Sequence, residues 1–469
     1  MTSSQTMQIA FLSLVLFTPA LLAQNTARAL PNAPEASTSL VASAQSPSSS
    51  SPVSSARGTG TPVLLTRQQA EKLALANNPN IQISQLIARV QHEVVRERRA
   101  DELPNVNGNV TAVEANDGSR ISSGSLTASR MLNHAGMGLQ LSQLITDFGR
   151  TANLIASAKL QEKARVADAE ASREDIILVT DQVFFAVIEA QDTLKVAAQT
   201  VSARQNLTDQ VSSLTSSKLR SDLDLSFAQV NLSQAKLLQL DAQNNLDAEK
   251  AALSAVLGYD TQMNFQLVED TSPLPPLPPD PEPLIAQAIQ NRPDLRSLNF
   301  SEQAAQKFSK AQHEQLLPTI TAIGVVGDTP TGSPQYFTST WYGAVGGNIS
   351  IPIFNGFRLS AQASEAALQA QAATQQTRAL RERVVRDVRT AWLNANTALQ
   401  RVTVTSQLVQ EANTALDLAK TRYDLGLSSI VELSQAELQQ TEAAISNANA
   451  KSQYSFAIST INFQTGMQP

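Results

Sequence analysis

The chain has 469 residues, a formal net charge of −6 and no cysteine. The lack of cysteine excludes a disulfide framework, a thiolate nucleophile and a cysteine-type zinc site. The charge balance is mildly acidic and no basic cluster occurs, so nothing supports nucleic-acid binding. The three histidines, His92, His134 and His313, show no metal-ligand spacing. We therefore expect no metal and no other cofactor.

The N-terminal region is typical of a secreted protein. Residues 9–23 form an apolar run that is too short for a comfortable transmembrane helix and ends at Ala23. We interpret residues 1–23 as a signal peptide. Residues 24–62 are rich in Ser, Ala, Pro and Thr, so we expect a disordered linker there. No other apolar run approaches membrane-spanning length, so a membrane crossing would have to use β-strands.

An internal duplication organises the rest of the chain. Pro79 and Pro104 lie 25 positions apart (104 − 79), as do Pro293 and Pro318 (318 − 293). The next segment is longer in the first copy (150 − 104 = 46 against 358 − 318 = 40), and such an insertion belongs in an exposed loop. The first repeat, a Pro-rich linker and the second repeat are expected at residues 63–270, 271–283 and 284–469.

Each copy also contains a very long stretch without proline. Arg150 to Gly258 and Arg358 to Gly466 both span 108 positions (258 − 150 and 466 − 358). Apolar residues recur there at steps of four and seven, which predicts long helices that pack like a coiled coil. About 70 helical residues at ~1.5 Å each reach roughly 100 Å. Each stretch therefore predicts one long helical hairpin.

Shorter helices precede the strand candidates in each copy. Thr66 with Gln69 forms a capping box, so the first helix is expected to run from there to about Glu102. The equivalent helix is expected to begin at Asp280, which is followed by a proline, and to run to about Leu316. A Leu-Pro pair ends both helices, because the residue before proline is pushed out of the helical region.

Four strand candidates follow these helices in pairs. Apolar and polar residues alternate along them, and a length of about 9–11 residues with one apolar face suits a strand that crosses a bilayer. From the strands alone, soluble β-hairpins are an equal alternative. The candidates are residues 106–115, 137–145, 319–326 and 341–353.

The turns of the two long hairpins differ in sequence. Gly426 can take a positive φ and end one helix, and Ser429 with Glu432 forms a capping box for the next helix. The residue that matches Gly426 in the first copy is Lys218. Because that turn lacks glycine, we expect it to be looser.

Ser221 and Asp224 repeat the Ser-x-x-acid pattern at the first turn. Asp224 and Glu432 therefore have two interpretations. Both cap helices, which is worth about 1 kcal/mol each. Both could also face a lumen, as an acidic ring that selects or gates at the narrow end of a tube.

Four strands cannot close a barrel, and open sheet edges in a bilayer leave backbone groups unpaired at a high cost in free energy. If the strands span a membrane, several subunits must share one barrel, and closed rings are the usual solution. The predicted fold class is therefore mainly α with β: duplicated long α-helical hairpins plus four transmembrane β-strands per subunit.

Four motifs occur in order along the chain: Leu75-Ala-Asn-Asn-Pro79, Asn291-Arg-Pro293, Pro352-Ile-Phe-Asn-Gly-Phe-Arg358 and Arg422-Tyr423-Asp-Leu-Gly426. With the duplication, they resemble the TolC-like outer-membrane efflux proteins over residues 63–466. The resemblance implies a homotrimer whose shared twelve-strand barrel lies in outer-membrane lipid, with a helical tunnel in the periplasm of a Gram-negative-type bacterium. It also implies that a periplasmic adaptor protein and an inner-membrane pump dock at the turns.

The resemblance also implies site residues. A periplasmic gate or constriction is expected at Glu432, Asp224, Tyr423 and Gln435, and an adaptor-docking tip at Leu425, Gly426, Leu427, Lys218 and Leu219. The chain departs from the family pattern at Ser428, where some members carry a bonding arginine. It also departs at Gln435, where some members carry a constricting aspartate.

These features predict a passive conduit in a tripartite efflux system, which exports small molecules with energy from the partner pump. An outer-membrane duct for type I protein secretion is an alternative on the same scaffold. A soluble periplasmic coiled-coil scaffold is an alternative from a different class. An enzyme is not expected, because the sequence has no phosphate-binding loop and no recurring set of acid, base and nucleophile.

Overall fold

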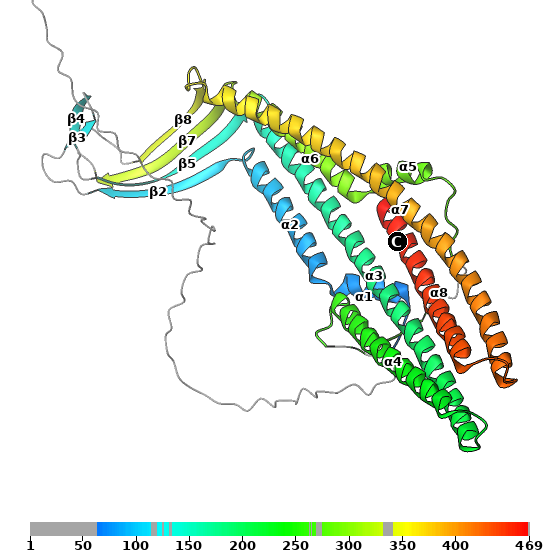
Figure 1. Cartoon of the computed structure of the whole chain (residues 1–469). Helices are drawn as coiled ribbons and strands as arrows, with labels where there is room; N and C mark the ends of the chain where they lie inside the picture. The colour runs from blue at the N-terminus through cyan, green and yellow to red at the C-terminus, as the bar shows by residue number, and fades with distance from the viewer. Residues whose placement is uncertain are drawn as a thin grey trace, which may run out of the picture. The chain divides into compact units, whose positions relative to one another are not determined.

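The computed structural model describes residues 63–113, 120–123, 126–130, 134–261, 263, 265–268, 274–331 and 341–467. All of these residues belong to one compact unit, Gly58–Pro469. The signal peptide expected at residues 1–23 and the linker expected at residues 24–62 lie outside the described residues. Within the described part, long helices run side by side and a β-sheet lies at one end of them (Figure 1). None of the described helices is long and apolar enough to cross a membrane.

Two long helical hairpins make up most of the helical part, as the sequence predicted (Figure 1). Their first helices, α3 and α7, have 67 residues each. At ~1.5 Å per residue, each is roughly 100 Å long. Within the hairpins α3 packs on α4 and α7 on α8, and α3 also packs along α8. The bounds are α3 Arg150–Ser216, α4 Asp222–Val256, α7 Arg358–Asp424 and α8 Ile430–Thr465.

The two helices that precede the strand pairs are each broken in two, which corrects the prediction that each is one uninterrupted helix. The chain leaves the helical region at Asn78 and at Arg292, where ψ is 122° in both cases. Each of these residues precedes a proline, which disfavours the α conformation. The Asn78 side chain accepts the backbone N–H of Asn80 at 2.9 Å and so caps the second piece. The four pieces are α1 Arg67–Asn77, α2 Pro79–Ala100, α5 Glu282–Asn291 and α6 Pro293–Glu314.

The predicted N-terminal caps of α1 and α5 differ in outcome. At α1 the capping box is complete: the N–H of Gln69 bonds Thr66 Oγ1 at 3.4 Å, and the N–H of Thr66 bonds Gln69 Oε1 at 3.0 Å. The helix α5 begins only at Glu282, later than expected. Asp280 Oδ1 still accepts the Glu282 N–H at 3.2 Å, because the prolines on either side of Glu282 have no N–H to offer.

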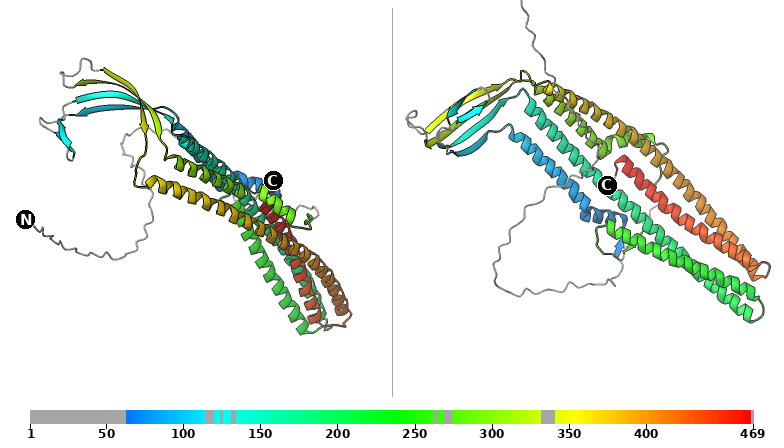
Figure 2. Two further views of the ribbon diagram at one scale, coloured as in Figure 1. Left: turned by 90° about the horizontal axis from the view of Figure 1, so that it is seen from above. Right: turned by 60° about the vertical axis from the view of Figure 1, so that its left-hand side comes forward.

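A four-stranded antiparallel sheet lies at the end of the helices opposite the hairpin turns (Figure 2). Its strand order is β2-β5-β7-β8, so the pairing of β5 with β7 joins the two copies of the repeat. The structure confirms the predicted strands, with shifts at their ends. The bounds are β2 Asn105–Val113, β5 His134–Thr146, β7 Thr319–Thr331 and β8 Trp341–Ser350.

A short hairpin that the sequence did not reveal lies between β2 and β5. It consists of β3 Arg120–Ser123 and β4 Leu126–Arg130. Strands of 4 and 5 residues are too short to show a clear alternation. The hairpin falls in the segment where the first copy is longer than the second.

The register of the sheet separates an apolar face from a polar face. Direct partners on neighbouring antiparallel strands lie on the same face, and Val106, Leu141, Gly324 and Val345 form one such row. The other face carries Asn107, Asn109, Thr111, Gln140, Ser142 and Asn348, together with Ile323 and Val325 of β7, so it is polar mainly on β2 and β5. The apolar face exposes the side chains of Val106, Val110, Met137, Leu139, Leu141, Val326, Trp341, Val345 and Ile349.

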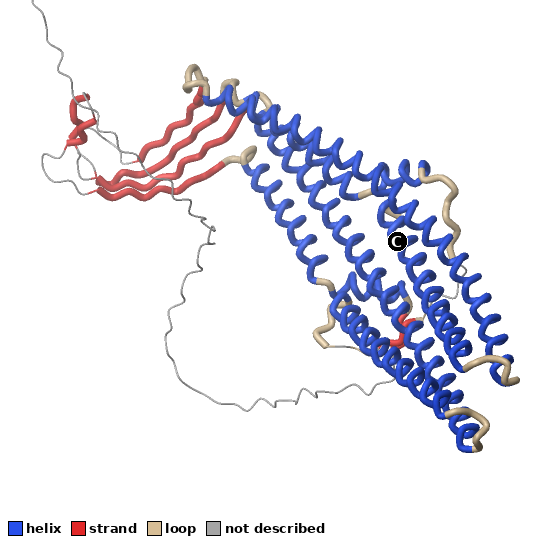
Figure 3. The backbone as a smooth tube through the Cα atoms, viewed as in Figure 1, coloured by secondary structure: helices blue, strands red, loops and turns tan. Residues whose placement is uncertain are grey.

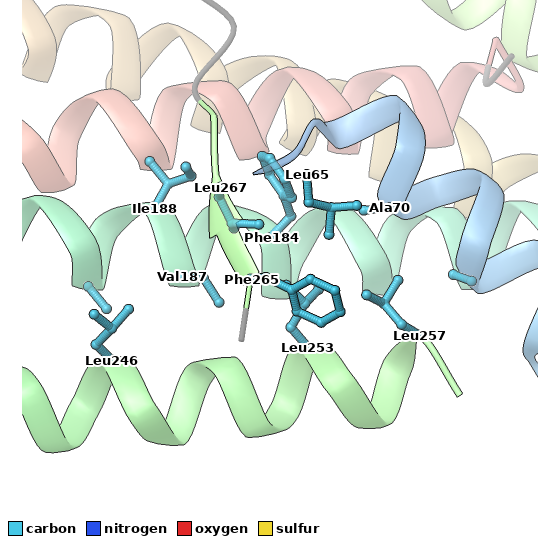
Figure 4. Packing of buried hydrophobic residues seen from close by; sticks show 12 residues of the cluster. Leu65, Ala70, Phe184, Val187, Ile188, Leu246, Leu253, Leu257, Phe265 and Leu267 are labelled. Carbon is cyan, nitrogen blue, oxygen red and sulfur yellow. The ribbon is translucent and has the colours of Figure 1, made fainter. Parts of the chain in front are cut away.

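A second small sheet, also absent from the predictions, lies beside the end of α4 (Figure 3). It is a parallel pair of β1 Val63–Leu65 with β6 Phe265–Leu267. Each strand has three residues, which is too short for a periodic signal. Figure 4 shows the buried cluster that these strands close, which includes Leu65, Phe265 and Leu267 with Phe184 and Val187 of α3 and Leu253 of α4.

In the second copy, the place of the small sheet is taken by the Pro-rich segment around Pro275 and Pro278, which we call the strap. The counterpart of the buried Phe184 is Trp392 (392 − 184 = 208). Trp392 Nε1 donates to the carbonyl oxygen of Pro278 at 2.8 Å, and the Tyr454 hydroxyl donates to that of Pro275 at 2.5 Å. The Pro-rich segment thus crosses α7 and α8 and is held by aromatic hydrogen-bond donors, which often find such a partner when buried.

A matched pair of valines on α3 tests the assigned core. Val187 is 0% exposed and Val179 is 44% exposed. Val187→Ala removes buried carbon atoms and leaves a cavity, so it should lower the free energy of unfolding by about 2 kcal/mol. Val179→Ala should change it by less than about 0.5 kcal/mol. Denaturant unfolding of the detergent-solubilised protein, followed by circular dichroism, measures both, and equal losses would contradict the assigned core.

Candidate functional site at the helical turns

The turn between α7 and α8 lies at the end of the helices farthest from the sheet (Figure 2). Gly426 has φ +72°, and its N–H bonds the carbonyl oxygen of Tyr423 at 3.0 Å. The Leu427 N–H bonds the carbonyl oxygen of Arg422 at 2.8 Å. This pair of bonds is a Schellman motif, in which a residue in the left-handed conformation ends a helix. Gly426 therefore ends α7 as expected.

The turn between α3 and α4 has the same geometry although it contains no glycine. Lys218 has φ +60°. Its N–H bonds the carbonyl oxygen of Thr215 at 2.9 Å, and the Leu219 N–H bonds that of Leu214 at 2.9 Å. The expectation of a looser turn is therefore wrong: the lysine adopts the conformation that glycine has in the other copy, which costs roughly 1–2 kcal/mol.

The two acidic candidates make different contacts at the starts of α4 and α8. Asp224 completes a capping box with Ser221, through N–H···O distances of 3.1 and 3.3 Å. Ser429 Oγ accepts the Glu432 N–H at 3.4 Å, which is only half of the predicted box. The Glu432 carboxylate pairs with Arg422 at 3.1 Å, because a guanidinium is a stronger partner for a carboxylate than a backbone N–H. Glu432 thus connects the last turn of α7 to the first turn of α8.

Tyr423 and Arg220 hold the two turns together. The Tyr423 side chain is buried, and the Arg220 guanidinium lies 4.3 Å from the centroid of its ring. Arg220 Nη2 also donates to the carbonyl oxygen of Tyr423 at 2.7 Å. Burial raises the pKa of the Tyr423 hydroxyl, and the charge of Arg220 opposes this. A cation over a ring and a charge-assisted hydrogen bond act here at one contact, which we call the Arg220 clasp.

Arg220 is not among the residues predicted for the gate or for the docking tip. This residue stands 208 positions before Ser428 (428 − 220 = 208), which is the position where some members of the family pattern carry a bonding arginine. The arginine that is absent from the second turn is therefore present on the first turn. A comparison of the two copies at this spacing would have found it.

An apolar cluster behind the turns packs the two hairpins against each other. It joins Val211 of α3 to Tyr423 of α7 and to Ile430 and Leu433 of α8. Leu207 of α3 packs against the same cluster, four residues before Val211, as the helical period requires. The clasp thus closes the outer end of a dry contact between the hairpins.

A polar layer follows the apolar cluster, further from the turns. The buried Arg204 donates from Nη1 to the carbonyl oxygen of Asn231 at 2.9 Å, and its Nε lies 3.7 Å from the Glu437 carboxylate. Asn231 Nδ2 donates to Ser434 Oγ at 2.6 Å. Burial raises the pKa of Glu437, and Arg204 opposes this. A pocket of about 280 Å³ lies beside the pair.

None of the residues of this polar layer was predicted. Isolated polar residues on a periodic helix are usually part of a solvated face, so the sequence offers no signal that separates these from their neighbours. Only the packing of α3 and α4 on α8 identifies them as internal.

The candidate docking residues are exposed at both turns. Leu219, Leu425 and Leu427 are 70%, 69% and 68% exposed. Leu219 and Leu427 occupy the same position of their turns, directly after the left-handed residue. Lys218 is exposed beside them. The two turns therefore present similar apolar tips.

The candidate constriction residues are only partly brought together within one chain. Tyr423 and Glu432 lie at the second turn, and Asp224 is half-buried at the first. The Gln435 side chain is exposed and forms no hydrogen bond with the described part of the chain. Among the described residues, no group of three or more acidic or histidine side chains is placed to hold a metal ion.

Comparisons with known proteins agree on one family. A family model described as outer membrane efflux protein matches residues 71–259 and 284–466. The outer membrane protein TolC of Escherichia coli (strain K12) is 25% identical over 417 residues, which cover 85% of this chain and 81% of TolC. The outer membrane efflux protein BepC of Brucella suis biovar 1 (strain 1330) is 25% identical over 349 residues, which cover 73% of each chain.

A solved structure shows the same fold. The outer-membrane channel OprN superposes with a TM-score of 0.74 at 19% identity, and the match covers 86% of this chain and 90% of that chain. This likeness supports the arrangement of helical hairpins and strands described above. Because the family model matches both copies of the repeat, the chain belongs to the outer membrane efflux protein family and is an outer-membrane protein.

Proposed function

We propose that the chain is one subunit of a trimeric, passive conduit through the outer membrane, which exports small molecules within a tripartite efflux assembly. One observation carries the proposal. The sheet exposes an apolar face, its two edges pair with no other strand of the described residues, and it lies at the end of the helices opposite the exposed turns.

The edges of the sheet require other strands. β2 and β8 each pair on one side only among the described residues. Inside a bilayer, water cannot satisfy the free backbone groups, so an open sheet is not a stable membrane structure. If β8 of each copy pairs with β2 of the next, the ring closes without edges, and three copies of the four-stranded sheet supply twelve strands.

The side chains of the sheet suit this surrounding. The apolar face would contact lipid, and the face that carries asparagine, threonine and glutamine would line the lumen. Aromatic residues lie near both ends of the strands: Trp341 starts β8, and the exposed Phe354 and Phe357 follow it. Aromatic side chains favour the two interfaces of a membrane.

Exposed apolar stripes on the helices support the same ring. α2 exposes Ile83, Leu86, Ile87 and Val90, and α7 exposes Leu368, which is as far from the start of α7 (368 − 358 = 10) as Val90 is from the end of α2 (100 − 90 = 10). Because α7 follows β8 and α2 precedes β2, pairing of β8 with a second copy's β2 would bring α7 beside that copy's α2. Apolar residues at such spacings suit packing between long helices.

The turns would form the gate and the docking tip. We propose that Glu432, Asp224, Tyr423 and Gln435 of the copies surround the narrow end of the lumen, where an acidic ring would favour cations. The similar tips with Leu219, Leu425 and Leu427, together with Gly426 and Lys218, offer a periplasmic adaptor two related sites on each subunit. An inner-membrane pump would supply the energy, since the chain has no phosphate-binding loop.

The Arg220 clasp should control the separation of the two turns. Arg220→Ala removes both of its contacts with Tyr423, so the turns should separate and their distance distribution should broaden. Spin labels on cysteines introduced at Ser217 and Asp424 report this distance, because the chain has no cysteine of its own. Arg378→Ala, which removes an exposed arginine of α7, is the control. Identical distributions for Arg220→Ala and the unmodified turns would contradict a clasp.

Conductance tests the conduit itself. In planar lipid bilayers the purified protein should conduct weakly. The Arg220 clasp holds the two turns together, and the Arg422–Glu432 pair holds α7 to α8 at the second turn. The double variant Arg220→Ala, Arg422→Ala should conduct several-fold more, whereas Arg378→Ala should not differ from the unchanged protein. If the membrane-inserted double variant conducts no ions at all, the proposed conduit is wrong.

A further inference from the structure

A buried group of charges joins α1 to α3 in the first copy. Glu71 and Asp181 are both buried, with exposed fractions of 5% and 1%. A single guanidinium nitrogen lies close to both: Arg67 Nη1 donates to Asp181 Oδ2 at 3.1 Å and lies 3.2 Å from Glu71 Oε1, which is buried and accepts no hydrogen bond within the described residues. The other carboxylate oxygen of Asp181, Oδ1, is buried and has no hydrogen-bond donor within the described residues.

When Glu71 is ionised, the two buried carboxylates have only one cation in close contact. The groups that act on it are Asp181 from α3 and Arg67 and Lys72 from α1 itself. Two buried carboxylates share one close guanidinium, and removing a buried charge from water without full pairing is costly. A proton on Glu71 cancels one charge and provides a hydrogen-bond donor between the two carboxyl groups.

We propose that protonated Glu71 holds α1 against α3, and that loss of this proton releases α1 together with β1. The release would also open the buried cluster beside the end of α4, because Leu65 of β1 belongs to that cluster. β1 would then lose its pairing with β6. This inference concerns the flank of the long helices and does not depend on the proposed function.

The direction of the pH effect follows from the burial. Burial raises the pKa of Glu71 from 4.5 to about 7; repulsion by Asp181 adds to this and Arg67 opposes it. An acid whose pKa is higher in the docked state stabilises docking most below its free value of 4.5. That contribution is lost as the pH rises towards about 7. Docking of α1 should therefore weaken over this interval and be weakest above it.

The second copy lacks the device and provides an internal reference. The counterpart of Asp181 is Arg389 (389 − 181 = 208). Arg389 pairs with Glu282 of α5 at 2.7 Å, and the two side chains are 53% and 61% exposed. One base and one acid at the surface need no proton to balance, so docking of α5 should not change between acidic and alkaline pH.

Hydrogen–deuterium exchange of the full-length protein in detergent tests the proposal, with rates corrected for the intrinsic effect of pH. Between pH 5 and pH 8, opening of α1 should increase by at least about tenfold, because each unit of pKa shift corresponds to a factor of ten. Opening of α5 should not increase. Glu71→Gln keeps a hydrogen-bond donor towards Asp181 at every pH, so α1 should stay protected at pH 8.

Matched variants keep the test decisive. Burial also raises the pKa of Glu174 on α3 to about 7, so Glu174→Gln is the control and should leave the step in α1 unchanged. Asp181→Asn removes the repelling charge and should shrink the step, even if Glu71→Gln proves to destabilise α1 at both pH values. A full step in both Glu71→Gln and Asp181→Asn, or an equal step in α5, would overturn the proposal.

Discussion

Backbone hydrogen bonding at the two edges of the large sheet constrains the whole molecule. A strand buried in an apolar surrounding must pair both sides of its backbone, and β2 and β8 each pair on one side within the described chain. The same sheet exposes an apolar face, from Val106 on β2 to Val345 on β8. A sheet with that face in lipid and those edges open needs strands from further copies. The proposed ring of subunits supplies these strands and pairs both edges.

The connections to the strands of the sheet determine where the long helices lie. α3 follows β5 and α7 follows β8, whereas α2 and α6 precede β2 and β7. Each strand therefore continues into, or out of, a helix that runs away from the membrane. The turns must then gather at the opposite end, and the position of the exposed leucines follows from the connections of the chain.

The two copies share their geometry but use different chemistry at equivalent positions. Phe184 packs in an apolar cluster, whereas Trp392 donates a hydrogen bond to a proline-rich strap. Asp181 belongs to a buried acid pair, and its counterpart Arg389 forms an exposed ion pair. Arg220 supplies the arginine that the second turn lacks. A contact between the copies, such as that of Arg220 with Tyr423, needs an arginine at only one of the two equivalent positions.

The sequence predicted those features that depend on periodicity, spacing and proline. The hairpins, the four strands and the Gly426 turn could be found because long helices, alternating strands and left-handed glycine leave clear local patterns. The breaks at Asn78 and Arg292 also have a local mark, because each of these residues precedes a proline. The three-residue strands β1 and β6, and the polar layer around Arg204, depend on residues far apart in the chain, so no local pattern marks them.

Lysine at position 218 shows the limit of residue preferences. Its left-handed conformation is unfavourable by itself, yet the hydrogen bonds of the turn and the flanking helices impose it. A preference of about 1–2 kcal/mol for one residue is small beside the packing of two long helices. This packing holds Lys218 in the left-handed conformation.

The mass of the detergent-solubilised particle tests whether neighbouring copies complete the sheet. Light scattering or native mass spectrometry of protein extracted from membranes should give three chains per particle, with no free single chain. A single chain that remains in water without detergent would contradict the shared sheet, and with it the conduit.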